Sequence, residues 1–179
     1  MMKKILLMAA FAVASLTANA QLWLGGSLSF DYEKIKGADG KVTFGLAPSI
    51  GYNLNDKWAL GLEIGFKVAN DGWGSNLAIA GQKYTMFNVA PYARYTFASV
   101  GTANFFVDGG VGVGYEKVGG DDGTAFHIGF RPGVAFNISD HVSFVGTTGY
   151  FGYRHAEDYN HFGLNVNNEL ASVGFFYTF

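Results

Sequence analysis

The first information in this sequence lies in what it lacks. Its 179 residues include no cysteine, so neither a disulfide framework nor thiol chemistry is available. Charged residues make up 15% of the chain, below the roughly one quarter that is typical of soluble domains. The 12 Lys and Arg are outnumbered by 14 Asp and Glu, so no basic patch suggests a nucleic-acid partner.

Long apolar runs are also missing from most of the chain. After Gln21 no apolar stretch reaches the roughly 18 residues of a transmembrane helix. Aromatic residues reach 17%, and 26 glycines are too many for a helical protein. A glycine-rich, aromatic-rich and charge-poor chain leaves two main classes open, a transmembrane β-barrel and a soluble β-sandwich or barrel.

The first twenty residues have the features of an export signal. Lys3 and Lys4 precede a short apolar run over residues 5–14, and Ala18-Asn19-Ala20 has the small-x-small pattern of a cleavage site. We therefore predict a cleaved secretory signal peptide over residues 1–20 and one domain over residues 21–179. The alternative is an uncleaved membrane anchor.

Alternation of apolar with small or polar residues dominates the rest of the chain and predicts β-strands. Eight strands are expected. They cover Leu22–Tyr32, Val42–Leu54, Trp58–Val68, Tyr84–Phe97, Phe105–Glu116, Ala125–Ile138, Val142–Tyr153 and a last one over Ala171–Phe179. The apolar phase changes within the seventh strand, which predicts a bulge there.

The expected connections alternate in length. Short ones are expected at 55–57, 98–104 and 139–141, and longer ones at 33–41, 69–83, 117–124 and 154–161. Tight turns at one end and longer loops at the other are typical of an antiparallel outer-membrane barrel. The longer connection at 154–161 contains His155, Glu157, Asp158 and His161, for which a solvated loop competes with a surface metal site.

The face opposite the apolar stripe decides between the two classes. It carries mainly glycine, serine and alanine, where a soluble barrel would turn charged residues to water. Small residues suit a narrow interior, so the large apolar side chains are expected to face lipid. Strands of ten or eleven residues, tilted by roughly 40°, cover about 25 Å, the height of such a membrane band. The sequence therefore predicts an all-β, eight-stranded antiparallel up-and-down transmembrane β-barrel.

The three prolines of the chain repeat in register. Pro48, Pro91 and Pro132 each lie on the expected lipid face, about six residues above a short turn and near mid-bilayer. Proline cannot donate a backbone hydrogen bond. We expect each to mark a bend or bulge that helps the barrel to close; the alternative is an inherited repeat without a present role.

Several charged residues alternate with the apolar stripe and are expected to face the interior. We predict an ion-pair network in the lumen. It comprises Glu63, Lys67, Arg94, Asp108, Glu116, His127 and Arg131. Arg94 is expected between Glu63 and Asp108, and Arg131 beside Asp108 or Glu116. Such a network fits a structural plug better than an ion path, because eight strands leave an interior barely wide enough for side chains.

The signal peptide, the eight alternating strands and the ending "SVGFFYTF" resemble the outer-membrane β-barrel domain family, which includes small OmpA-domain and OmpX-like barrels of Gram-negative bacteria. Phe175, Tyr177 and Phe179 are similar to the family's assembly signal. The resemblance implies an integral outer-membrane protein exported through the periplasm. Its implied partners are outer-membrane lipid and lipopolysaccharide, periplasmic chaperones and the barrel-assembly machinery.

The functional expectation follows from these features. No enzyme motif, cofactor loop or metal signature was found in the sequence, so neither catalysis nor a cofactor is expected. We expect a monomer with a structural and surface-exposed role in envelope integrity, adhesion or host interaction through its outer loops. The alternatives are a narrow channel for small solutes, a lipid-modifying outer-membrane enzyme and a soluble barrel.

Overall fold

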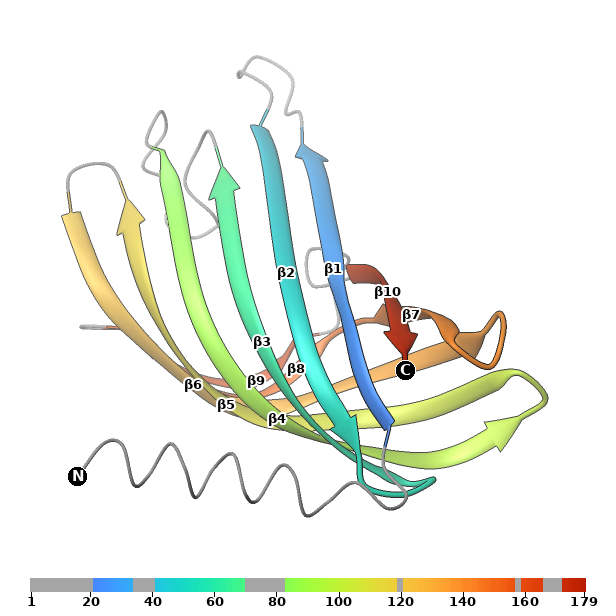
Figure 1. Ribbon diagram of the computed structural model, residues 1–179. Helices are drawn as coiled ribbons and strands as arrows, with labels where there is room; N and C mark the ends of the chain where they lie inside the picture. Colours follow the sequence, from blue (N-terminus) through green and yellow to red (C-terminus); the bar gives the residue numbers. More distant parts are fainter. Residues whose placement is uncertain (1–20, 34–40, 70–82, 119–120, 157–158, 166–171) are drawn as a thin grey trace, which may run out of the picture.

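The computed structural model describes residues 21–33, 41–69, 83–118, 121–156, 159–165 and 172–179 as an antiparallel β-barrel (Figure 1). The predicted segment 1–20 lies outside these ranges. The strands are β1 (Gln21–Glu33), β2 (Lys41–Asn53), β3 (Trp58–Ala69), β4 (Tyr84–Val100), β5 (Ala103–Val118), β6 (Asp121–Asn137), β7 (Val142–Thr147), β8 (Tyr150–Ala156), β9 (Tyr159–Asn165) and β10 (Ser172–Thr178). Within the described ranges, no helix has the length and apolar character that crossing a membrane requires.

The strands form a closed ring. Each strand from β1 to β6 pairs with the next, β6 pairs with both β7 and β8, and β10 joins β7 to β1. Because β7 and β8 occupy one position in the wall and β9 and β10 the next, the ring is an eight-stranded barrel. The predicted fold class is confirmed.

The seventh position of the wall contains the predicted irregularity. In β6, Gly133 pairs with Thr147 of β7 and Phe130 pairs with Phe151 of β8. The segment from Thr147 to Phe151 is therefore one residue longer than the segment of β6 that it faces. Gly149 adopts a φ of 72°, which glycine reaches without steric strain. The bulge brings the two apolar phases of the sequence onto one outer face.

Two connections that we expected to be long are short. β5 continues to Val118 and β6 begins at Asp121, so only residues 119–120 lie between them. The expected loop over 154–161 is also wrong, since β8 and β9 pair from Tyr150 with Asn165 to Ala156 with Tyr159. Polar residues there continue the ladder, because a strand needs apolar side chains only where its face meets hydrocarbon.

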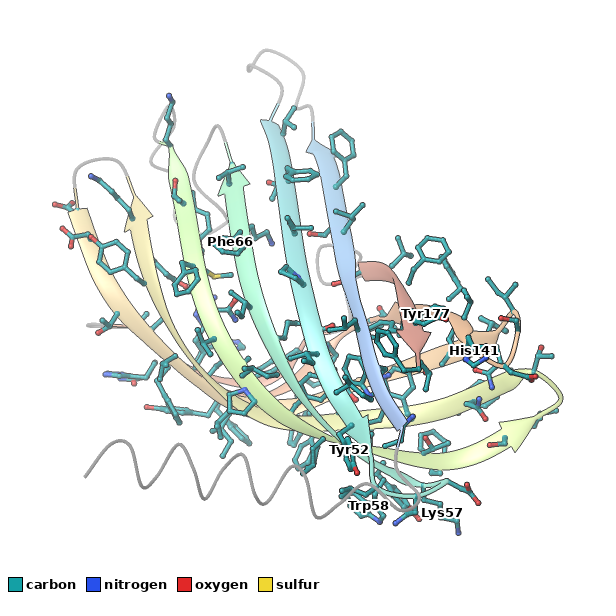
Figure 2. The ribbon with its side chains drawn as sticks, in the orientation of Figure 1. Tyr52, Lys57, Trp58, Phe66, His141 and Tyr177 are labelled. Atoms are coloured by element: carbon teal, nitrogen blue, oxygen red, sulfur yellow. The ribbon has the colours of Figure 1, made fainter. Side chains whose placement is uncertain are left out.

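Side-chain oxygens organise two of the short turns. The Asn55 Oδ1 accepts hydrogen bonds from the backbone N–H groups of Lys57 and Trp58, both at 2.9 Å. The Ser139 Oγ accepts one from the Val142 N–H at 3.1 Å. Figure 2 shows Tyr52, Lys57 and Trp58 gathered at this short-turn end of the barrel.

The barrel is apolar outside. Large apolar side chains stay exposed along the wall, such as Phe66 at 46% and Phe175 at 61%. The few buried large side chains point inward, including Phe106 at 1% and Trp23 at 4%. This distribution is the reverse of a soluble domain and is stable only when lipid covers the outer face.

The prolines interrupt the ladder at three seams. The pairing of β2 with β3 skips Pro48, that of β4 with β5 skips Pro91, and Pro132 lies where β6 changes partner from β7 to β8. Each proline pairs normally with the strand on its other side. The register shifts at Pro132 but is unchanged across the gaps at Pro48 and Pro91, so neither of these two marks a bulge; the register shift of the β4–β5 seam lies instead between Thr96 and Ala98. That each proline marks a bend stays a prediction.

The outward apolar face leads to a stability prediction. Leu62→Arg places a cation near mid-bilayer and should destabilise the barrel by about 2–4 kcal/mol, measured by urea unfolding in lipid vesicles. The control is Leu22→Arg at the short-turn rim, where the same charge should cost about 0–1 kcal/mol. Equal costs at the two positions would contradict the assignment of the outer face to lipid.

Candidate functional site: the charged interior

Register brings three of the predicted charges into one row across neighbouring strands. Arg94 in β4 pairs directly with Asp108 in β5, and Asp108 pairs with Arg131 in β6. All three occupy inward positions, because side chains alternate between the two faces of a strand. The row therefore alternates positive, negative and positive charge inside the wall.

The Arg94–Asp108 pair is the tightest contact in this row. The Nε and Nη2 atoms of Arg94 donate to the two carboxylate oxygens of Asp108 at 2.7 and 2.9 Å. The side chains are only 14% and 3% exposed. Two parallel charge-assisted hydrogen bonds satisfy both oxygens, which a carboxylate needs when it is withdrawn from water.

A second pair crosses the interior. The Nη1 and Nη2 atoms of Arg131 in β6 donate to the two carboxylate oxygens of Glu63 in β3 at 3.4 and 3.3 Å. β3 and β6 are not neighbours in the sheet, so this contact links opposite walls. Arg131 also lies 3.8 Å from Asp108, which joins the two pairs into one network of four charges.

A third ion pair lies nearer the end of the barrel that is away from the short turns. Arg154 in β8 donates to the carboxylate of Glu116 in β5, across the intervening strand β6. Arg154 was not among the predicted residues of the interior, because it lies in the segment 154–161 that was expected to be a loop. Inward alternation with Tyr150 and Gly152 was the signal that could have found it.

Two further predicted residues of the interior, His127 and Lys67, lie farther along β6 and β3 from the short turns than Arg131 and Glu63 do. His127 pairs in register with Gly112 and Arg154, and its ring meets the edge of the Tyr150 ring at 6.3 Å between centroids. Lys67 lies in β3 opposite Gly45. The structure thus brings together Glu63, Arg94, Asp108 and Arg131, and places Glu116 in a separate pair.

The predicted assembly signal forms the outer face of the last strand. Phe175, Tyr177 and Phe179 are 61%, 46% and 60% exposed. The backbone N–H of Phe179 donates to the Leu22 carbonyl at 2.9 Å, which joins the end of the chain to β1. His141, which was not among the predicted residues, stacks on Tyr177 at 5.7 Å between ring centroids (Figure 2).

Within the described part of the chain, no three His, Cys, Asp or Glu side chains gather closely enough to hold a metal ion. Glu157 and Asp158 of the candidate surface metal site lie outside the described residues. The Asn160 Oδ1 instead lies 2.7 Å from both the Tyr153 hydroxyl and the His155 Nδ1. These three side chains form a polar cluster near the β8–β9 connection.

An antiparallel barrel with an apolar outside and a charged inside belongs to the class of membrane-spanning β-barrels. The sequence matches the pattern of the outer membrane protein beta-barrel domain over residues 5–179, and the chain belongs to this family. Membership places the protein in the bacterial outer membrane. The resemblance seen in the sequence is confirmed.

Solved structures of other proteins share this fold. Neisserial surface protein A is 17% identical with a TM-score of 0.53, and the alignment covers 90% of this chain and 99% of that one. A major outer membrane protein from Thermus thermophilus is 13% identical with a TM-score of 0.54, covering 89% and 99%. No curated protein matches the sequence of this chain.

The two carboxylates at the centre of the network differ in burial, which leads to a prediction. Asp108→Ala leaves the guanidinium of Arg94 buried without the carboxylate that accepts its two hydrogen bonds, and should destabilise the barrel by about 3–5 kcal/mol. Glu63→Ala removes a longer and more exposed contact and should cost about 1–3 kcal/mol. Urea unfolding in lipid vesicles measures both, and a larger loss for Glu63→Ala would contradict the ranking.

Proposed function

We propose that this protein is a non-enzymatic, structural and surface-exposed outer-membrane barrel whose lumen is closed by its ion-pair network. The observation that carries the proposal is the buried Arg94–Asp108 pair, 14% and 3% exposed, which the Glu63–Arg131 contact links to the opposite wall. A barrel of eight strands has little interior beyond its own side chains, so a buried pair braced across it leaves no continuous aqueous path. Its roles are envelope integrity and adhesion or host interaction.

The outward face supports a lipid-facing role at the end of the barrel that carries the connections 34–40, 70–83, 119–120 and 157–158. The Tyr115 hydroxyl donates to the Asp122 carboxylate, and the Tyr153 hydroxyl donates to the Asn160 Oδ1 at 2.7 Å. Tyrosine with its ring on an apolar wall and its hydroxyl on a polar partner suits the headgroup level of a membrane. In the proposed setting, lipopolysaccharide would surround this rim, and the connecting loops would contact other partners.

A narrow channel is the second candidate. Arg131 and Arg154 are 29% and 26% exposed although both point inward, so water reaches parts of the interior. Conductance separates the two functions. The purified full-length barrel in planar lipid bilayers should give no current steps if the lumen is closed, and discrete steps would favour the channel.

The surface role is tested directly by determining which end of the barrel faces the outside of the cell. The native chain has no cysteine, so single cysteines report unambiguous positions. Asp121→Cys lies at the start of β6 and Asp140→Cys in the turn before β7, and both native side chains are exposed. A bulky polymer-linked maleimide added to intact cells should label Asp121→Cys only, because Asp121 lies at the same end as the longer connections 34–40 and 70–83, and the end with longer connections faces outward in this class. Labelling of Asp140→Cys alone would contradict this orientation.

A further inference from the structure

Four aromatic rings converge inside the short-turn end of the barrel. Trp23 from β1 meets Phe176 from β10 at 4.9 Å and Tyr92 from β4 at 6.5 Å between ring centroids. The Arg94 guanidinium carbon lies 3.7 Å from the ring centroid of Phe106, in β5, and 5.6 and 5.8 Å from those of Phe176 and Tyr92. We call these five residues the floor.

Three of the four rings of the floor are almost inaccessible to water, and Phe176 is half-buried. Phe106 is 1% exposed, Trp23 is 4% and Tyr92 is 9%. Arg94 fits among the rings because its guanidinium stacks on a ring face while its edge holds Asp108. A cation placed in this way leaves no water-filled space in the layer of rings.

Each ring of the floor lies against an inward-facing glycine of another strand. The pairs are Trp23 with Gly51, Phe176 with Gly25, Tyr92 with Gly61 and Phe106 with Gly133. A Cβ atom at any of these glycines would overlap the ring beside it. The glycines therefore let large rings lie flat within a narrow lumen, which is why the inward face is glycine-rich around these rings.

The interior side chains farther from the short turns are more exposed to water. Arg131 is 29% exposed and Glu63 is 16% exposed, compared with 1% for Phe106. Buried oxygens without a hydrogen-bond partner also occur there, the Ser49 Oγ and the Asn88 Oδ1. Buried polar atoms of this kind ordinarily bind water.

From this contrast we infer that the permeability barrier of the barrel is the aromatic floor around Arg94, and that the Glu63–Arg131 contact above it braces the wall within a hydrated space. The inference rests on the proposed closed lumen and locates the closure. A layer of packed rings excludes water and ions because it offers them few polar partners, and the guanidinium of Arg94 is already held by Asp108. An ion pair whose side chains are 29% and 16% exposed, with its N and O atoms 3.3 Å apart, competes with water for its hydrogen bonds and seals less well than packed rings.

Conductance of two variants in planar bilayers tests the location. Phe106→Ala removes a ring from the floor and should produce current steps where the native barrel gives none. The matched control is the double variant Glu63→Gln with Arg131→Met, which removes the cross-barrel charges with little change in volume and should remain silent. Heat-modifiable gel mobility confirms that each variant is folded before it is measured.

The outcomes separate this inference from the function on which it rests. Steps from the native barrel would overturn both. A silent native barrel with steps from the double variant, or with none from folded Phe106→Ala, would overturn the floor as the barrier and leave the closed lumen intact.

Tryptophan quenching tests the floor without opening it. The chain has three tryptophans, so Trp58→Phe with Trp73→Phe leaves Trp23 as the sole reporter. Packed against Phe176 and Gly51, Trp23 should be quenched by aqueous iodide about fivefold less than Trp58 in the matching variant, since close packing excludes the ion. Strong quenching of Trp23, equal to that of Trp58, would show that water reaches the floor and would overturn the inference.

Discussion

The structure depends on one constraint, the need to pair backbone N–H and C=O groups inside a membrane that contains no water. An open sheet would leave two unpaired edges in hydrocarbon, so the last strand must reach the first. The hydrogen bonds of β10 with β1, from Trp23 with Thr178 to Leu28 with Val173, make this closure. Once the ring is closed, strand alternation fixes which side chains meet lipid and which share the narrow interior.

That shared interior explains why charge and aromatic rings occur together in it. Eight strands enclose too little space for a free water column, so interior side chains must satisfy one another. Asp108 is held by Arg94, and Arg94 in turn is covered by the ring of Phe106. The glycines opposite the rings supply the remaining room. Charge pairing, ring stacking and glycine placement together fill the narrow interior.

The sequence predicted the fold well because period-two alternation records the two faces of each strand. It predicted the inward direction of Glu63, Arg94, Asp108 and Arg131 for the same reason. It could not predict that Arg131 reaches Glu63, since alternation says nothing about contacts across the lumen. It missed Arg154 because a run of polar residues above the membrane resembles a loop, although its backbone continues the ladder.

The proline interruptions divide the wall into units. The pairs β1–β2, β3–β4 and β5–β6 have continuous ladders, whereas the seams after β2, β4 and β6 each lose contact at a proline. Mechanical resistance is therefore distributed unevenly around the circumference. A force that pulls the chain out of the membrane would meet strong bonding within each hairpin and weaker bonding between hairpins, so the barrel should be extracted two strands at a time.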